Sequence, residues 1–363
     1  MIGPESRYYQ SSRKPGEQRI SPEPAPERIV ENGLIRLGMF TAPVRDMNLA
    51  ESALLRGAGK SWPSPPLLVE WIGAGIAHPD WYLGMIVVDA KAASLAVVYG
   101  YNRKTGFYFS HDRPGFRGQA CVPASTWDSL TRFDGRGYRL EIVHRLELGH
   151  HEVSIDIAAS GQKPAVQGKL VWHEEPGRIQ PLVLMSPIRG GGFIYNHKAQ
   201  MPVEGSLRIG SDRLEFRPDR DIANMDDLKL HPSLQGLNYR WFNFGGFDRK
   251  GRLVGADLAH TPQKPDSYWA ENCLWVDNRL SVCDPVHFEA DWGDPMKPWR
   301  ATDEAGNIDV TFFPEGGKTV SLRPFGIYHQ KCGRFRGRIM DAAGETHEIS
   351  DYYGCAEYAS IPA

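Results

Sequence analysis

The feature that most constrains the fold is a repeated alternation of apolar and polar residues in short stretches that end at turn residues. The clearest stretch is Tyr138–Leu148, in which every second residue is apolar or histidine and most residues between them are charged. Gly149 and His150 allow a tight turn, and His151–Ile157 alternates in the same way. A period of two residues places successive side chains on opposite faces of a strand. The pattern therefore predicts an antiparallel hairpin.

Similar strand and turn patterns recur along the chain, at Trp81–Asp89, Leu95–Tyr101, Phe107–His111, Ser206–Phe216, Tyr239–His260, Leu274–Cys283 and Arg334–Ile349. Helical periodicity is confined to one candidate, Arg45–Arg56. The 38 Gly and 27 Pro residues exceed the usual share of about 12% and supply many turns. Consecutive hairpins favour sheets that close on themselves, because closure removes exposed edges. The sequence therefore predicts an all-β protein.

The length of 363 residues is too great for one eight-stranded barrel, so we expect two β-domains in tandem. Residues 1–30 are polar and Pro-rich, which predicts an N-terminal arm that is poorly ordered or wrapped on the surface. The Pro- and Gly-rich stretch Pro181–Pro202 is the candidate crossing between domains. The expected domains are residues 31–190 and 191–363.

Composition narrows the classes of partner and cofactor. Lys and Arg total 42 against 44 Asp and Glu, and this balance lacks the basic excess of a nucleic-acid-binding surface. No run of about 18 apolar residues predicts a membrane span, and no secretory signal precedes the polar arm, so a cytoplasmic location is expected. Five widely spaced Cys residues and the lack of a phosphate-loop motif predict neither a metal site nor a cofactor.

The densest cluster of aromatic and polar residues lies between residues 230 and 275. On one predicted strand Tyr239, Trp241 and Asn243 share a face, and the next strand ends at His260. Apolar rings with a few placed polar groups are typical of a ligand chamber.

In the same cluster, Trp269 and Glu271 are two residues apart and lie on the same side if the segment is extended. Burial against rings would raise the pKa of Glu271 and keep it protonated as a general acid. In the alternative interpretation Glu271 holds a turn or pairs with Arg240 or Arg279.

Three further places are weaker candidates for substrate binding. Asp80 and Trp81 begin a predicted strand, where Asp80 is either a second acid or an ordinary turn residue. His144 lies on the apolar face of its strand, as a site residue or as a hydrogen-bonded core histidine. Lys198 is either a clamp for an acidic group or a solvated loop lysine.

The chain also resembles a bacterial family catalogued as a domain of unknown function, number twenty-eight-zero-four, from about residue 30 to the C-terminus. The segments that carry the resemblance are Asn32–Gly33, Gly38–Phe40, Lys198, Pro202–Gly205, Tyr239–Asn243, Glu271–Asn272, Trp275, Pro298–Trp299, Phe335–Gly337 and Gly354–Glu357. That family is distantly similar to calycin-like proteins with two lipocalin-type domains: carotenoid hydratases, tocopherol cyclases and Diels–Alderase-type cyclases. The resemblance implies two tandem lipocalin-like antiparallel barrels or sandwiches, with Trp241 and Trp269 as ring walls and Glu271 as acid.

Three functions are compatible with these features. The leading interpretation is an enzyme without a redox cofactor that hydrates, dehydrates, isomerises or cyclises an apolar or aromatic small molecule by general-acid chemistry. The second is a lipocalin-like protein that only binds or carries a hydrophobic ligand. The third is a carbohydrate-active protein, which requires two carboxyl groups such as Asp80 and Glu271 about 5–10 Å apart. The sequence does not predict the substrate or the oligomeric state.

Overall fold

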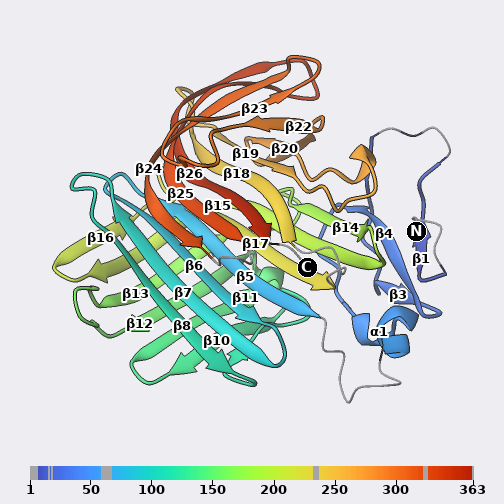
Figure 1. The fold of residues 1–363 in the computed structure, drawn as a ribbon, viewed down its shortest axis with the longest axis horizontal. Coiled ribbons are helices and arrows are strands. Elements are labelled where there is room, and N and C mark those ends of the chain that lie inside the picture. Colours follow the sequence, from blue (N-terminus) through green and yellow to red (C-terminus); the bar gives the residue numbers. More distant parts are fainter. Residues whose placement is uncertain are drawn as a thin grey trace.

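The computed structural model describes residues 7–14, 17, 19–58, 68–231, 237–321 and 326–361, and nearly all of them belong to two β-sheets (Figure 1). The helices within this described part are short: the 3-10 turns Leu49–Glu51, Leu146–Leu148 and Ser267–Trp269, and the α-helix α1 (Ala53–Ala58). The all-β prediction is therefore confirmed. The only candidate helix of the sequence, Arg45–Arg56, corresponds to the first 3-10 turn and most of α1.

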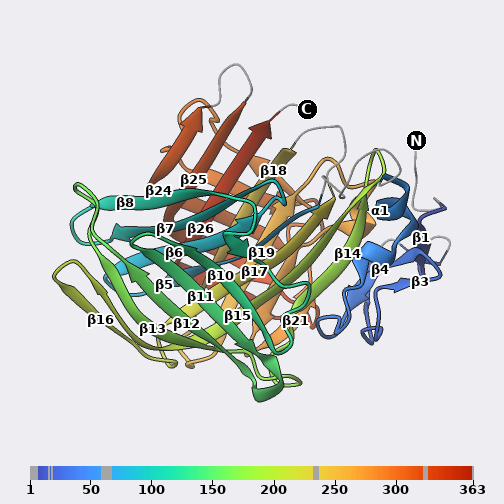
Figure 2. The same cartoon turned by 90° about the horizontal axis from the view of Figure 1, so that it is seen from below.

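The first sheet contains seventeen strands. They are β1 (Tyr9–Ser11), β2 (Pro22–Glu23), β3 (Val30–Glu31), β4 (Leu34–Phe40), β5 (Val69–Ala77), β6 (Trp81–Asp89), β7 (Ala93–Asn102), β8 (Tyr108–Phe116), β9 (Ala120–Cys121), β10 (Ser129–Gly135), β11 (Tyr138–Arg145), β12 (His150–Ile157), β13 (Val166–His173), β14 (Leu182–Ile188), β15 (Gly192–Ile209), β16 (Asp212–Phe216) and β17 (Ile222–His231). Strand β17 returns to pair with β5, and this pairing makes the main part of the sheet a near-closed barrel (Figure 2).

The barrel interior is filled by apolar side chains at alternate positions of its strands. The predicted hairpin is present as β11 and β12, which pair from Tyr138 opposite Ile157 to Arg145 opposite His150. Leu140, Ile142 and Ile155 are among the side chains that this pairing directs into the core. The core is thus packed by side chains, as in small barrels generally.

The second sheet contains nine antiparallel strands in the order β21-β20-β19-β18-β26-β25-β24-β23-β22. They are β18 (Leu237–Phe247), β19 (Leu253–His260), β20 (Cys273–Val276), β21 (Arg279–Val282), β22 (Val286–Glu289), β23 (Trp299–Asp303), β24 (Ile308–Ser321), β25 (Ile327–Met340) and β26 (Thr346–Ile361). This sheet curves into a half-barrel around Phe242, Trp299, Phe312 and Phe335. The prediction of two tandem β-barrel or sandwich units of lipocalin-like type is confirmed as a near-closed barrel followed by a half-barrel.

The change from one sheet to the other lies between His231 and Leu237. Residues 191–209, assigned to the second domain by the sequence, contain β15, which pairs with β13, β14, β16 and β17 of the first sheet. Within the predicted arm, β1 and β2 pair with β4, and Tyr9 and Ile20 are buried. The division into folding units at residues 190 and 191 stays a prediction.

The sheets meet through a cluster of Tyr and Cys side chains from β6, β7, β25 and β26, namely Tyr82, Tyr99, Tyr101, Cys332, Tyr353 and Cys355. Beside it the Gln200 amide of β15 donates to the Phe244 carbonyl of β18 at 2.7 Å. Gly255 of β19 leaves room for this amide, which a Cβ at that position would overlap. The two sheets are therefore closely packed against each other.

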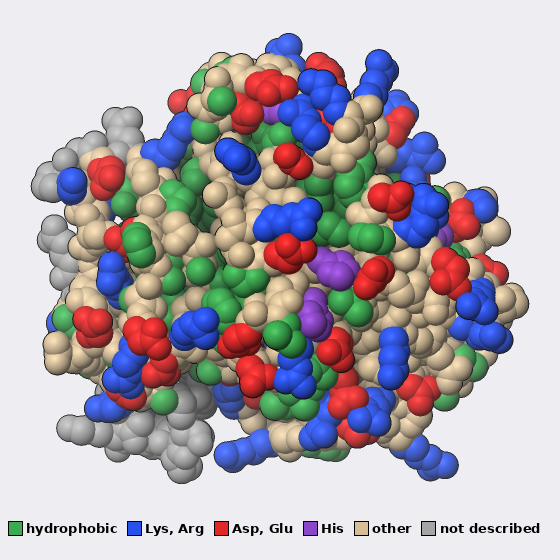
Figure 3. Space-filling model, turned by 180° about the vertical axis from the view of Figure 1, so that it is seen from behind, with side chains coloured by type: hydrophobic (Ala, Val, Ile, Leu, Met, Phe, Trp, Pro, Cys, Tyr) green, Lys and Arg blue, Asp and Glu red, His purple; other side chains and the backbone are tan. Residues whose placement is uncertain are grey.

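Figure 3 shows Lys and Arg side chains interspersed with Asp and Glu side chains over the face opposite to that of Figure 1. None of the helices that the structure describes is long and apolar enough to cross a membrane.

Candidate active site

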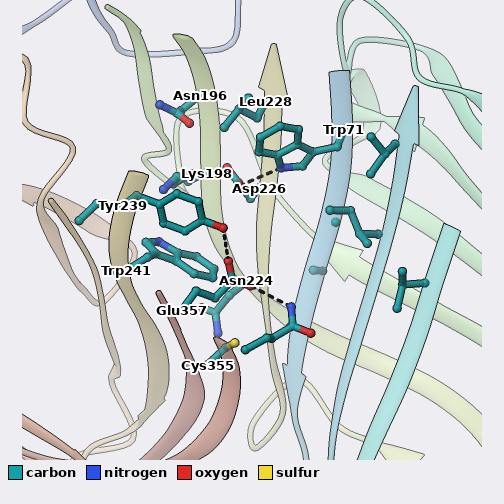
Figure 4. A pocket seen from close by; sticks show the side chains of 18 of the residues that line it. Trp71, Asn196, Lys198, Asn224, Asp226, Leu228, Tyr239, Trp241, Cys355 and Glu357 are labelled. Atoms are coloured by element: carbon teal, nitrogen blue, oxygen red, sulfur yellow. Dashed lines mark hydrogen bonds between the residues drawn. The ribbon is translucent and has the colours of Figure 1, made fainter. Parts of the chain in front are cut away.

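A cavity of about 440 Å³ lies between the two sheets, and both contribute to its walls (Figure 4). The first-sheet wall is formed by Val69, Trp71, Gly73, Ala74, Gly75, Tyr82, Met85, Ile86, Val88, Leu95, Val97, Tyr99, Ile194, Asn196, Lys198, Asn224, Asp226, Leu228 and Leu230. The second-sheet wall is formed by Tyr239, Trp241, Ala259, Thr261, Glu271, Lys318, Tyr328, Gln330, Cys355, Glu357 and Ile361. The volume and the predominance of apolar and aromatic side chains are typical of a small-molecule site.

The first-sheet wall is the outer face of the barrel. On β17 the residues Asn224, Asp226 and Leu228 line the cavity, whereas Ala223 and Met225, on the other face of the strand, belong to the barrel core. The antiparallel register of β15 and β17 places Lys198 directly opposite Asp226. On the other side of β17, Gly73 is opposite Asp226, and the Trp71 ring two residues away reaches the Asp226 carboxyl.

Asp226 is the carboxyl group whose environment favours the neutral form. Its Oδ2 accepts a hydrogen bond from Trp71 Nε1 at 3.3 Å, and its buried Oδ1 has no hydrogen-bond partner within the described part of the chain. Burial raises the pKa of Asp226 to about 7, because the opposing effect of Lys198 is offset by the nearby Asp257 and Glu271. Below this pH the group is a carboxylic acid that can donate its proton.

Lys198 is the buried cation of the site. Its Nζ lies 2.8 Å from Asp257 Oδ1 and 3.5 Å from Glu271 Oε2. Burial alone would lower the pKa of Lys198, but Asp257 and Glu271 outweigh it and hold the pKa well above its ordinary value. Asp257 also accepts hydrogen bonds from Trp241 Nε1 at 2.8 Å and from Asn243 Nδ2 at 2.9 Å, so the Trp241 ring is fixed at the cavity wall.

Glu271 lines the cavity, but its charge state differs from the one that the sequence suggested. Its Oε1 lies 3.5 Å from Lys264 Nζ, in addition to the contact with Lys198. Burial raises the pKa of Glu271, yet the two ammonium groups outweigh burial and hold it below its ordinary value. The expectation of a raised pKa is corrected, because the partners of Glu271 are two lysines and not Arg240 or Arg279. Glu271 is an ionised carboxylate.

The second-sheet wall carries another carboxylate, Glu357. It accepts hydrogen bonds from the Tyr239 hydroxyl at 2.7 Å, the Tyr328 hydroxyl at 2.7 Å and Gln330 Nε2 at 2.8 Å. Burial, followed by the proximity of Glu357, raises the pKa of Tyr239 well above its ordinary value, so the phenol stays protonated. Figure 4 shows this pair and the pair of Asp226 with Trp71 around the same space.

Of the residues that the sequence predicted, Tyr239, Trp241, Glu271 and Lys198 all line this cavity. Asn243 is buried behind Trp241 and bound to Asp257. His260 is exposed at the end of β19. Trp269 is fully buried in a core with Tyr268, because Ser267–Trp269 forms a 3-10 turn and does not extend toward Glu271. The catalytic and binding roles of these residues stay predictions.

The remaining candidates lie elsewhere. Asp80 pairs with Lys104 at 2.7 Å, and this hydrogen bond lowers the pKa of Asp80. Trp81 is buried in the barrel core. The fully buried His144 shares hydrogen bonds of 2.9 Å with Thr131 and with His151, in agreement with the alternative of a core histidine. The described residues that line the cavity do not include Asp80, Trp81 or His144.

Asp226, Glu357, Asn196, Asn224 and Trp71 are among the polar and aromatic cavity residues that the sequence analysis did not assign to the site. The side-chain amides of Asn196 and Asn224 are buried, and neither has a hydrogen-bond partner among the residues described. The available signal was limited to Asn224 and Asp226, two polar side chains that share one face of β17. Such unpaired buried groups at a cavity are suited to bind the polar atoms of a ligand.

Ligand atoms for a metal ion come together at one place in the described residues, the turn from β25 to β26. One such atom from each of Asp341, Glu345 and His347 lies within 4.8 Å of the others. His347 Nε2 already contacts Asp341 at 2.8 Å, and Arg252 contacts Glu345 at 3.3 Å. This group does not line the cavity.

Comparison with known proteins gives a family and a fold. The family model described as "Domain of unknown function (DUF2804)" matches residues 27–361. No curated protein matches the sequence. Among solved structures, kievitone hydratase from Nectria haematococca is similar with a TM-score of 0.52 and 11% identity, over 80% of this chain and 88% of that one.

Two further structures have the same fold. CghA, solved with Sch210972, is similar with a TM-score of 0.55 and 11% identity, over 82% of this chain and 89% of that one. A putative AttH from Nitrosomonas europaea is similar with a TM-score of 0.50 and 11% identity, over 82% of this chain and 93% of that one. At this level of identity the likeness concerns the fold alone, which is the two-domain calycin-like arrangement.

Proposed function

The chain belongs to the DUF2804 family, as its motifs predict, and on that premise we propose that it is an enzyme acting on an apolar or aromatic small molecule by general-acid chemistry without a redox cofactor. Hydration, dehydration, isomerisation and cyclisation are the reactions of this class. In each of them an acid that is neutral near pH 7 can deliver a proton, to an alkene, to a carbonyl oxygen or, in dehydration, to the hydroxyl group that leaves as water.

The observation that carries the proposal is the environment of Asp226. A pKa of about 7 makes it a proton donor near neutral pH, and it lines a cavity rather than a solvated surface. In the proposed mechanism Asp226 donates the proton. The faces of the Trp71, Tyr239 and Trp241 rings stabilise positive charge that develops on the substrate. Lys198 and the ionised Glu271 bind polar groups of the substrate.

This assignment moves the acid from Glu271 to Asp226 and keeps Trp241 and Tyr239 as cavity walls. It is supported by the fold, which this chain shares with a protein whose name is kievitone hydratase. The alternative, a protein that only binds or carries a hydrophobic ligand, is supported by the same aromatic lining. In the carbohydrate-active alternative, the pair of Asp80 and Glu271 is not supported, because Asp80 is not among the described residues that line the cavity.

The test begins by capturing the ligand. The purified protein is incubated with an apolar metabolite extract, and bound molecules are identified by mass spectrometry. Each captured molecule is then incubated in D2O with the wild type and with Asp226→Asn, which preserves size and the oxygen that accepts from Trp71.

We expect wild-type protein to change the molecule by the mass of water, or to isomerise it with uptake of deuterium. Asp226→Asn should bind it with similar affinity and turn it over about 10²–10⁴-fold more slowly. Binding without any conversion by the wild type would favour the carrier interpretation. Equal turnover by the variant would remove Asp226 from the mechanism.

A further inference from the structure

Two of the carboxyl groups that line the cavity, Asp226 and Glu357, come from different sheets and have opposite surroundings. Glu357 accepts three hydrogen bonds, from Tyr239, Tyr328 and Gln330. Both carboxyl oxygens of Glu357 are therefore held by donors, one of which is the Tyr239 hydroxyl. Within the described residues Asp226 accepts one hydrogen bond, from Trp71, and burial favours its neutral form. Two carboxyl groups with such different environments are suited to act as an acid and a base.

Tyr239 connects Glu357 with the interior of the cavity. Its hydroxyl donates to Glu357 Oε2 at 2.7 Å, which leaves the lone pairs of the phenol oxygen able to accept. The ring lines the cavity from β18, and Figure 4 shows Tyr239 and Asp226 around the same space. A proton taken up by the phenol oxygen can therefore be matched by transfer of the phenol proton to Glu357.

We propose that the substrate is a carbonyl compound, that Tyr239 and Glu357 remove a proton from the carbon next to the carbonyl group, and that Asp226 protonates the carbonyl oxygen. This inference rests on the proposed function, in which Asp226 is the acid. The inference extends the proposed function by naming the base and the substrate class.

The step is balanced without an oxidant or a reductant. The C–H bond next to the carbonyl breaks, and its electron pair forms a C=C bond as its proton passes to the Tyr239 oxygen and the Tyr239 proton passes to Glu357. The C=O π pair forms a bond to the Asp226 proton, so that an enol results. Return of the enol proton to Asp226, with delivery of a proton to carbon from Glu357 through Tyr239, restores both groups.

Other polar groups of the cavity fit a carbonyl substrate. The unpartnered amides of Asn196 and Asn224 flank Lys198 and Asp226 along β15 and β17, at spacings of about 7 Å along each strand. They can bind further oxygen atoms of the substrate and fix its carbonyl at Asp226. Apolar residues of β5, β6 and β7 remain for the hydrocarbon part of the molecule.

The experiment uses 2-tetralone, a bicyclic ketone whose C1 hydrogens are acidic because they lie between the carbonyl group and a benzene ring. Binding is measured first by quenching of tryptophan fluorescence. Exchange of the acidic hydrogen in D2O is then followed by mass spectrometry for the wild type, Glu357→Gln and Tyr239→Phe. Tyr101→Phe serves as the control, because it removes a phenol from the inter-sheet cluster at a residue that does not line the cavity.

We expect the wild type and Tyr101→Phe to accelerate exchange above the rate in buffer to the same degree. Glu357→Gln and Tyr239→Phe should each reduce the acceleration at least about 10²-fold, with binding of 2-tetralone changed only a few-fold. Thermal unfolding identifies a variant that fails to fold, and the other variant then decides the result.

Three results would overturn the inference: no binding of 2-tetralone by the wild type at millimolar concentration, no acceleration of exchange, or full acceleration in both variants. The proposed function is judged separately, by the captured molecule. If its turnover depends on Asp226 but not on Glu357 or Tyr239, the inference is wrong and the proposed function stands. If its turnover does not depend on Asp226 either, both are wrong.

Discussion

Replacement of Asp226 by Asn should stabilise the folded protein at high pH while it removes the acid. The pKa of Asp226 is raised from 3.8 to about 7 in the folded state. A group with a raised folded-state pKa contributes stability that is fully present below its unfolded value and is lost as the pH rises through its folded value. At about 1.4 kcal/mol for each pH unit, the loss for this shift is about 4 kcal/mol in total.

Asn does not titrate, so the variant is spared this loss. Between pH 5 and pH 8 its free energy of unfolding should rise relative to the wild type by about 3 kcal/mol, which is most of the total. At about 2.1 cal/mol/K per residue, 1 kcal/mol corresponds to about 1.3 °C of Tm in a chain of 363 residues, so the difference in Tm should grow by roughly 4 °C. Differential scanning fluorimetry at unit steps of pH measures it.

Glu271→Gln is the matched control with the opposite sign. The pKa of Glu271 is lowered in the folded state, so its contribution is present above the unfolded pKa and lost as the pH falls through the folded value. This variant should be less stable than the wild type at pH 8, with a deficit that shrinks below about pH 4.5. A difference in Tm between Asp226→Asn and the wild type that is the same at pH 5 and pH 8 would refute the reasoning, since Asp226 would then be ionised throughout.

Further predictions concern activity and packing. With the captured substrate, kcat/KM should fall about tenfold per pH unit above a pH of about 7, where Asp226 loses its proton; a flat profile to pH 9 contradicts this. Lys198→Met should lower the free energy of unfolding in urea by about 3–5 kcal/mol, because Asp257 and Glu271 lose their shared cation. An unchanged urea midpoint would show that the two carboxylates do not depend on Lys198. Gly255→Ala should lower Tm by an amount equivalent to about 1–3 kcal/mol, because its Cβ overlaps the Gln200 amide, and no shift is the contrary result.

The sequence could predict those parts of the site that lie close together in the chain. Tyr239 and Trp241 share a strand face by their spacing alone, and both line the cavity. Glu271 was also recognised as a cavity acid, but its charge state depends on Lys198, which is 73 positions away in the chain. Periodicity carries no information about such a partner, so its effect on the pKa was not predictable.

Asp226 and Glu357 escaped prediction for a related reason. Asp226 belongs to no local motif, and the family segment Gly354–Glu357 does not by itself indicate that Glu357 lines a cavity. They become a pair because the outer face of one sheet packs against another sheet, an arrangement that hairpin patterns do not specify. The fold class could be predicted because every hairpin is local, whereas the cavity brings together residues such as Asp226 and Glu357, which are 131 positions apart in the chain.

The position of the cavity on the outside of the barrel separates two demands on the same strands. Along β17, Met225 packs in the barrel core and Asp226 lines the cavity. Adjacent residues of one strand therefore determine the stability of the barrel and the chemistry of the cavity. Substitutions at Asn224 or Leu228 can alter which molecules fit without disturbing the packing of the core. Specificity can therefore diversify within the family at alternate positions of a strand, whereas a single inserted residue would exchange the two faces and destroy both properties at once.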